Sequence, residues 1–410
     1  MLPENIPLIT RLDNGLRVVS RRRPGAAVSY IGVLINAGSR DDNPNHEGLA
    51  HFVEHTIFKG TLNRKNWQIT SRMESVGGEL NAYTSKEETM LYTCSPEGYE
   101  ERAVELLADL IKNSNFPTDE IEREREVVIE EIYSYLDSPV DAVYDEFEEN
   151  AYAGSGLAHN ILGSPESVRL LTGNNCRAFI DRLYTPANMV VYCSSPIDND
   201  KFLKLIQKYF GRLHFPAPHK QIVTPPSIKP FDIIKKNGNH QANSIIGART
   251  FGRQDPGRFA LFLLNNYLGG PGMNSRLNRE LREKRGYVYA VDSTVSLMSD
   301  TGLMMVYFGC EPSKLKKCKK IIFEEIDRLC QTKLTDTALE KIKRQYCGQL
   351  MVGSDHIESR TMALAKSLVY FDTIIDIPIT RRFIMEVTAE QLMETARLLA
   401  PERCSSLTLA

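Results

Sequence analysis

The sequence predicts an α+β protein made of two homologous α/β domains, each with a mixed or antiparallel sheet backed by helices. Three observations support this fold class. The chain of 410 residues is too long for one ordinary domain and has room for two of about 200 residues each. A proline-rich segment divides it near the middle, and the sequence on one side of that segment resembles the sequence on the other. We therefore expect one fold used twice.

The dividing segment runs over residues 214–230 and contains five prolines. Proline at this density resists both helices and central strands, because its ring fixes φ and removes a backbone donor. We therefore predict a catalytic domain over residues 1–215, a linker over 216–230 and a homologous second domain without a metal over 231–410.

The two halves share a succession of elements. Residues 88–132 and 301–350 each have the pattern of an apolar strand, a turn with a proline, an amphipathic helix, a Thr-Asp pair and a second, charged helix. The pair that begins at Thr118 corresponds to the pair that begins at Thr335, 217 residues later. A repeat of this length predicts two sheets of the same topology, each backed by helices.

Composition places the chain among soluble globular proteins and narrows its partners. Hydrophobic residues make up 42% and charged residues 25% of the chain. The formal net charge of -2 gives no reason to expect nucleic acid or an acidic membrane as a partner. No apolar run approaches the roughly 20 residues of a membrane span, and the N-terminal stretch lacks the pattern of a secretory signal.

The eight cysteines are scattered along the chain, with no CxxC pair. In a chain of this length, such spacing is typical of reduced, buried thiols rather than of a disulfide framework. We therefore predict a cytoplasmic protein.

The motif that carries chemistry is His-Phe-Val-Glu-His at residues 51–55. On a helix, His51 and His55 project from one face one turn apart, so both imidazoles can reach a single ion. Glu54 lies on the same face, where its carboxylate can reach a water beside that ion. Two histidines suit Zn²⁺, but a catalytic zinc normally takes three protein ligands, and a carboxylate commonly supplies the third. The plain alternative is a surface helix that carries two histidines by chance.

This inverted form of the HExxH signature resembles the pitrilysin family of zinc metallopeptidases, the inverzincins. In that family the third ligand is a glutamate on a later helix, and another glutamate precedes it by two helical turns. Here Glu131 lies 76 residues after His55, which is the family's spacing, and Glu124 lies seven residues before Glu131. Glu130 is the rival ligand, but on a helix it is turned by about 100° from Glu131. The resemblance therefore implies one zinc per chain, held by His51, His55 and Glu131.

The resemblance covers essentially the whole chain. The segments GLRVV, INAGSRDD, GLAHFVEHTIFKGT and GGELNAYTSKEETMLY follow the order found in the family, and the length matches its shorter, two-domain members. It implies that Glu54 is the catalytic base and that Glu124 orients a ligand histidine or its helix. It also implies a homodimer whose domains enclose a chamber for unfolded peptides.

Two residues of the second domain are implicated by the same resemblance. The family carries an arginine and a tyrosine seven residues apart, which contact the substrate near the scissile bond, and Arg282 and Tyr289 match this pair. Arg285 and Tyr287 are the alternatives if the register shifts. The tyrosine would stabilise the oxyanion of the tetrahedral intermediate.

The segment from Gly78 to Thr84 has the pattern of an edge strand. In the family the peptide substrate adds to this edge as an extra strand, so main-chain hydrogen bonds hold it and sequence specificity stays broad. Within the segment we expect Gly78, Asn81 and Ala82 to contact the substrate, with Asn81 supplying a side-chain contact. The alternative is an ordinary buried strand.

Two other functions stay open. A presequence-processing peptidase, like the related mitochondrial enzyme, would need an unlike partner chain, whereas this chain carries both the metal motif and the Arg/Tyr pair. A catalytically inactive structural relative would have lost metal residues, and all of them are present here. We therefore predict a self-sufficient zinc metalloendopeptidase; copurification of an unlike chain, or a purified protein without metal, would favour the alternatives.

Overall fold

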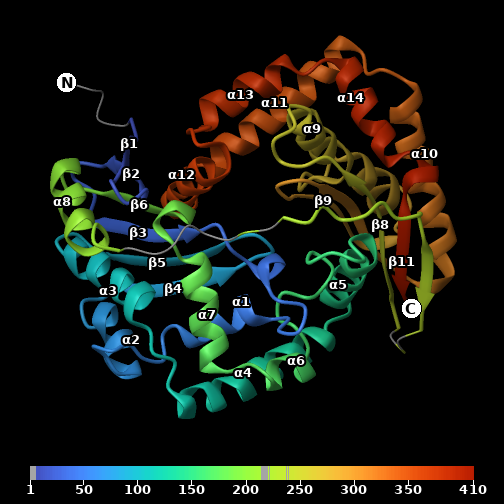
Figure 1. The fold of residues 1–410 in the computed structure, drawn as a ribbon. Coiled ribbons are helices and arrows are strands. Elements are labelled where there is room, and N and C mark those ends of the chain that lie inside the picture. The colour runs from blue at the N-terminus through green and yellow to red at the C-terminus, as the bar shows by residue number, and fades with distance from the viewer. Residues whose placement is uncertain (1–5, 214–219, 221, 237, 239) are drawn as a thin grey trace. The chain divides into compact units, whose positions relative to one another are not determined.

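The computed structural model describes residues 6–213, 220, 222–236, 238 and 240–410. The chain divides into two compact units, and in Figure 1 each contains one sheet with helices against it. Unit 1 consists of Met1–Ser134, His159–Val223 and His356–Ile375, and unit 2 of Tyr135–Ala158, Thr224–Asp355 and Asp376–Ala410.

Unit 1 contains a six-stranded mixed sheet with the order β1-β2-β6-β3-β5-β4. Its strands are β1 (Leu8–Arg11), β2 (Arg17–Arg22), β3 (Val28–Ile35), β4 (Glu79–Thr84), β5 (Thr89–Pro96) and β6 (Met189–Ser195). Strands β2 and β6 run parallel, and the other neighbours are antiparallel. β4 forms one edge of the sheet, as the sequence predicted.

Both faces of this sheet are covered, because its central strands are apolar at successive positions. Val33 and Val191 belong to a core that includes residues of α1, α3, α4 and α7, whereas the adjacent Leu34 and Val190 pack with Leu364 of α12. The helices of this part of the chain are η1 (Ser39–Asp41), α1 (Leu49–Thr56), α2 (Asn66–Glu74), α3 (Glu100–Asn113), α4 (Thr118–Leu136), α6 (Pro165–Arg169), α7 (Gly173–Leu183), η2 (Pro186–Asn188), α8 (Asn199–Phe210) and α12 (Ile357–Phe371).

Unit 2 contains a five-stranded sheet with the order β7-β11-β8-β10-β9. Its strands are β7 (Asp232–Lys235), β8 (Ala242–Thr250), β9 (Val288–Leu297), β10 (Gly302–Cys310) and β11 (Ser405–Leu409). Its helices are α5 (Pro139–Ala151), α9 (Arg258–Gly269), η3 (Asn278–Glu283), η4 (Pro312–Lys314), α10 (Leu315–Gln331), α11 (Asp336–Gly353), α13 (Ile377–Glu386), α14 (Ala389–Ala396), η5 (Arg397–Leu399) and η6 (Pro401–Arg403).

The two sheets repeat one topology. β2, β6, β3, β5 and β4 of unit 1 correspond in order to β7, β11, β8, β10 and β9 of unit 2, and the parallel pair stands at the same place in both. The helices α3 and α4 follow β5 as α10 and α11 follow β10. Thr118 is the first residue of α4, and Thr335 caps α11 by accepting a hydrogen bond from the Ala338 amide. The predicted fold class and its internal repeat are therefore confirmed.

The division of the chain is less simple than the boundaries drawn from the sequence. α5, from the first half of the chain, belongs to unit 2, and α12, from the second half, belongs to unit 1. The predicted domains 1–215 and 231–410 do not include this exchange. Its cause is apolar packing: Phe147 of α5 lies in a core with Leu407 of β11, and Figure 1 shows α5 beside β8 and β11.

Part of the predicted linker, residues 214–219 and 221, lies outside the described residues. The described residues 222–230 contain no helix or strand, as the prolines predicted. In the part of the chain that the structure covers, no helix combines the length and apolar character needed to cross a bilayer.

All eight cysteines are free, and seven of them are buried. Their burial agrees with the predicted role as small apolar side chains.

Candidate metal centre

The two histidines of the motif lie on α1, whose start is fixed by close backbone packing. Gly48 precedes the helix with a φ of 89°, in the left-handed region that glycine adopts most easily. A Cβ at this position would lie 2.5 Å from the Leu162 carbonyl oxygen. Buried Asp42 accepts hydrogen bonds of 2.9 Å from the amides of Gly48 and Ala50, which otherwise have no partner within the helix. The first turn of α1 is therefore held in one place.

His51, His55 and Glu131 come together as the sequence predicted. Their ligand atoms, one from each residue, all lie within 4.8 Å of one another. His55 Nε2 is 3.3 Å from Glu131 Oε2, and His51 Nε2 is 3.7 Å from the same oxygen. Two ligands at zinc distances of about 2.0–2.1 Å, set at a tetrahedral angle, are about 3.3 Å apart. The spacing of these donors therefore fits zinc.

Glu131 is positioned by α4, which buries one stripe of its surface against the unit 1 core. Ile121, Val128 and Ile132 are buried along this helix, and Glu131 is half-buried beside them. Glu130 is exposed and does not belong to the ligand group. The helical rotation of about 100° between neighbouring residues separates the two glutamates as expected.

The two imidazoles differ in their electrostatic surroundings. Burial, with a smaller effect of His55, lowers the pKa of His51 to about 3, so this imidazole is neutral at pH 7. Its buried Nδ1 has no hydrogen-bond partner among the described residues. Burial alone would lower the pKa of His55, but the carboxylates of Glu124 and Glu131 outweigh it and raise that pKa. Two imidazoles and a carboxylate are a donor set that catalytic zinc takes, and these residues fit it.

Glu124 connects the metal group to Lys59. Glu124 is 8% exposed, its Oε1 lies 2.9 Å from His55 Nδ1, and its Oε2 lies 2.6 Å from Lys59 Nζ. Burial opposes ionisation of Glu124, but its hydrogen bonds with His55 and Lys59 lower the pKa of the carboxyl. The contact with His55 agrees with the orienting role expected of Glu124, which stays a prediction, and the sequence analysis did not foresee Lys59. The available signal was its position four residues after His55.

Glu54 lines a cavity of about 310 Å³ beside His55. Phe58, Ile69 and Leu80 form its apolar wall. Burial, reinforced by the charge of Glu131, raises the pKa of Glu54 above the usual range of a glutamate. Such a shift brings a carboxylate closer to the pKa at which a general base works well near neutral pH.

The edge strand β4 lies close to α1. Asn81 is exposed and Ala82 is half-buried on this strand, and Gly78 immediately precedes it. A Cβ at Gly78 would lie 2.8 Å from the Cys94 carbonyl oxygen, so the strand approaches β5 too closely for a larger residue. The edge position is confirmed, while contact of these residues with a substrate stays a prediction.

Tyr289 lies on β9 of unit 2, at an irregularity in the β9–β10 pairing. Its ring packs against Gly309, where a Cβ would overlap the ring, and its side chain is 48% exposed. Its hydroxyl donates to Asn243 Oδ1 at 3.3 Å and lies 3.2 Å from the Tyr307 hydroxyl. Bulges commonly redirect a side chain near functional sites. Nothing in the sequence pointed to Asn243 or Tyr307.

Arg282 lies in η3 and is exposed, whereas the alternative residues have other contacts. Arg285 pairs with Glu280 at 2.9 Å. Tyr287 is half-buried, with Lys314 Nζ 5.5 Å from its ring centroid. Contact of Arg282 and Tyr289 with a substrate, in preference to Arg285 and Tyr287, stays a prediction.

Two copies of one α/β fold, with a candidate His-His-Glu metal group in the first copy, define this protein as a two-domain α+β protein with one candidate metal site. Comparison with known proteins identifies its family. The model described as insulinase (peptidase family M16) matches residues 17–165, and that of the peptidase M16 inactive domain matches residues 171–346. An uncharacterized zinc protease of Mycobacterium leprae is 33% identical over 404 residues, which cover 98% of this chain and 91% of that protein. The chain belongs to peptidase family M16.

Further relatives agree on this assignment and on the fold. An uncharacterized zinc protease of Mycobacterium tuberculosis is 33% identical over 408 residues, covering 98% of this chain and 93% of that protein. The crystal structure of a protease from Helicobacter pylori matches with a TM-score of 0.90 and 24% identity, covering 99% of this chain and 100% of that one. A peptidase M16 inactive domain from Pseudomonas fluorescens has a TM-score of 0.90 and 19% identity, covering 98% of this chain and 97% of that one.

Proposed function

We propose that this protein is a zinc-dependent endopeptidase that hydrolyses unfolded peptides. The observation that carries the proposal is the convergence of His51, His55 and Glu131 within 4.8 Å, with Glu54 on the same helix at the wall of a cavity. Membership of family M16 and relatives named zinc proteases support both the metal and the reaction class.

The residues of unit 1 divide the chemistry among them. A zinc ion held by His51, His55 and Glu131 would polarise the scissile carbonyl and lower the pKa of the attacking water. Glu54 takes a proton from that water and passes it to the leaving amine. Glu124 accepts a hydrogen bond from His55 Nδ1–H, which selects the tautomer whose Nε2 lone pair faces the other ligands.

Peptide binding in this proposal uses the edge of β4. An extended peptide adds to that edge by main-chain hydrogen bonds, beside Gly78, Asn81 and Ala82. The cavity beside Glu54 receives one side chain of the bound peptide. Main-chain binding predicts broad sequence preference with a bias toward residues that fit this cavity.

Arg282 and Tyr289 are proposed as substrate contacts supplied by unit 2. Tyr289 donates a hydrogen bond to the carbonyl oxygen as negative charge develops on it, and this contact strengthens in the transition state. The exposure of the residue and its position at a strand irregularity support the assignment.

The active form is proposed to be a homodimer that encloses its substrates and so spares folded proteins. Sedimentation of the active protein tests this directly, since an active monomer contradicts it. Digestion of a mixed peptide pool and of a stably folded protein, followed by mass spectrometry of the cuts, tests the substrate class. Cleavage of peptides is expected only in the zinc-loaded wild type, and efficient cleavage of the folded protein would contradict the proposal.

A further inference from the structure

A line of three side chains leads away from the candidate metal group. His55 Nδ1 is 2.9 Å from Glu124 Oε1, and Glu124 Oε2 is 2.6 Å from Lys59 Nζ. Each oxygen of Glu124 therefore serves a different partner. The lysine is four residues beyond His55, just after the end of α1.

A buried carboxylate needs a countercharge, and the structure supplies one. Glu124 is 8% exposed, and taking an unpaired charge out of water is strongly unfavourable. His55 cannot provide this charge while it binds a metal, because a metal-ligating imidazole is neutral. Lys59 then remains as the cation bonded to Glu124.

A hydrogen bond and close packing restrict the path of the main chain on either side of Lys59. The Lys59 amide donates to the Thr56 carbonyl at 3.0 Å, so the turn continues directly from α1. A Cβ at Gly60 would lie 2.8 Å from Asn115 Oδ1 and 3.0 Å from a Pro117 ring carbon. A larger residue at this position would have to displace Asn115 or Pro117, so the chain leaves α1 through a narrow passage.

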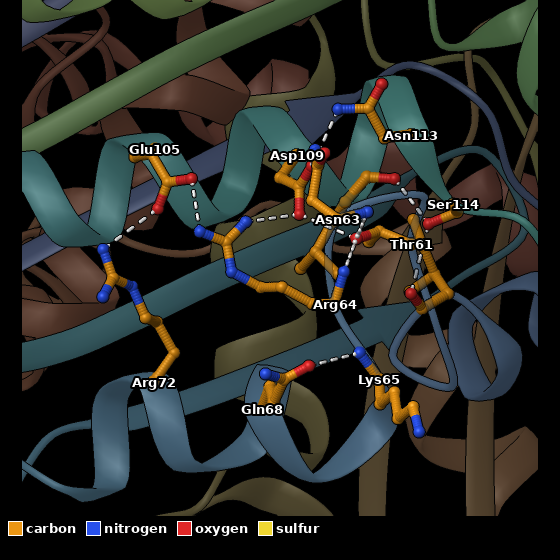
Figure 2. Close-up of polar contacts among 12 residues, drawn as sticks. Thr61, Asn63, Arg64, Lys65, Gln68, Arg72, Glu105, Asp109, Asn113 and Ser114 are labelled. Carbon is orange, nitrogen blue, oxygen red and sulfur yellow. Dashed lines mark hydrogen bonds and ion pairs between the residues drawn. The ribbon is translucent and has the colours of Figure 1, made fainter.

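The segment that follows is anchored by a polar cluster on α3, shown in Figure 2. Buried Asp109 accepts hydrogen bonds from Thr61 (2.9 Å), Asn63 (2.5 Å), Arg64 (2.5 Å) and Asn113 (2.7 Å). Four donors on one buried carboxylate fix this loop against α3. Lys59 is thus held between two anchored ends, the α1 helix and the Asp109 cluster.

We propose that Lys59 is a positioning residue of the metal centre, which acts through Glu124 to hold the His55 ring in its ligating orientation. The inference rests on the proposed function, because it assigns His55 as a zinc ligand. With Lys59 bonded to Oε2, Glu124 keeps its Oε1 on His55 Nδ1; without it, Glu124 is free to rotate toward water and the ring loses its support.

Lys59 also lines the cavity beside Glu54, which gives a competing role in peptide binding. The two roles predict different measurements. A positioning role changes the affinity of the protein for zinc itself, in the absence of any peptide. A peptide contact changes KM for peptide hydrolysis and leaves zinc affinity unchanged.

The experiment measures the zinc dissociation constant of the full-length protein by competition with a chromophoric chelator. The variants are Lys59→Met, Glu124→Gln and the double variant, with Lys65→Met as a matched control in an exposed lysine of the same segment. Outer contacts of metal-binding histidines are worth about 10- to 100-fold in affinity. We expect Lys59→Met to weaken zinc binding by about tenfold, the double variant to be no weaker than Glu124→Gln, and Lys65→Met to match the wild type.

Several outcomes overturn the inference. Unchanged zinc affinity in Lys59→Met removes the positioning role, and a raised KM alone assigns Lys59 to the peptide. Multiplicative losses in the double variant show that Lys59 does not act through Glu124. Lys59→Arg, which keeps the charge, is expected to restore most of the affinity and guards against a folding defect in Lys59→Met. A different result would contradict the proposed function instead: a wild type that binds zinc and shows the expected effects of Lys59 and Glu124 on zinc affinity, but has no peptidase activity.

Discussion

The two units carry the same sheet topology, but the metal group belongs to unit 1. In the repeat, α11 of unit 2 takes the place of α4, and Gly348 stands 217 residues beyond Glu131. Lys341 stands at the same distance beyond Glu124. In the described part of unit 2, no group of histidine, cysteine or carboxylate side chains has the spacing of metal ligands.

This difference shows that the fold determines where the helices and strands lie, whereas a few side chains determine whether a unit can bind a metal. The apolar residues that bury α4 and α11 keep both helices in place, because packing depends on the buried stripe and not on the polar positions. A glutamate in one copy and a glycine in the other are both compatible with the scaffold. In unit 2 the residue proposed to contact the substrate is Tyr289, on the edge strand β9.

The largest expected effect is removal of a zinc ligand from unit 1. His55→Ala or Glu131→Ala leaves two ligands, and we expect loss of bound zinc and of all measurable peptidase activity. Metal analysis of the purified variants checks this. Glu130→Ala is the matched control, since its side chain is exposed on the same helix. Full zinc content in Glu131→Ala would show that another residue completes the site.

Glu54→Gln separates the base from the metal. We expect zinc to be retained and kcat to fall by about 10²- to 10⁴-fold, the range for loss of a general acid-base group. Activity and metal content are measured on the same preparation. Wild-type turnover in this variant would remove Glu54 from the mechanism.

Tyr289→Phe tests whether unit 2 takes part in the chemistry. We expect zinc content and thermal stability to stay the same and kcat to fall by about 10²-fold, the scale for one oxyanion donor. Tyr287→Phe is the control, because this half-buried tyrosine is the alternative in the sequence register. Equal turnover in Tyr289→Phe and wild type would leave unit 2 without a catalytic role.

Asp109→Asn tests the anchored loop of unit 1 rather than its chemistry. Burial opposes ionisation of Asp109, but its hydrogen bonds with Asn113, Asn63, Thr61 and Arg64 lower its pKa below the usual range. Because its pKa is lowered in the folded state, the ionised carboxyl stabilises the fold at pH values above the ordinary carboxyl pKa. This stabilisation is lost as the pH falls from that value through the lowered pKa. We expect the variant to lose about 1–3 kcal/mol at pH 7.

Urea unfolding at pH 7 and at pH 3 checks the sign of this effect. The difference between wild type and Asp109→Asn is expected to shrink on acidification, because below the ordinary carboxyl pKa the unfolded wild type binds a proton that the folded carboxyl still excludes. An equal difference at both pH values would contradict the assigned charge of Asp109.

The smallest expected effect concerns the glycine that replaces Glu131 in the repeat. A Cβ at Gly348 would meet nothing within 4 Å, and the residue lies inside α11. Gly348→Ala is therefore expected to raise the free energy of unfolding by about 0.5–1 kcal/mol through helix propensity. Urea unfolding measures the change. A loss of stability would show that a methyl group at this position is not accommodated, contrary to the open space around Gly348.

The sequence by itself determined the repeat, the edge strand and the candidate ligand set. Helical spacing places His51 and His55 on one face of α1 and turns Glu131 away from Glu130 on α4, and these are local properties of a backbone with 3.6 residues per turn. The distance from His55 to Glu131 along the chain became informative through the resemblance to a family. Local geometry and a known spacing were sufficient for the candidate site.

Other features were decided by the tertiary structure alone. The exchange of α5 and α12 between units follows from which apolar faces fit together, and periodicity does not say which sheet a helix will cover. The contact of Lys59 with Glu124 joins residues 65 positions apart, and Tyr289 meets Asn243 across a sheet. Such contacts depend on how whole elements pack, because a side chain's distant neighbours are fixed only once the core has formed.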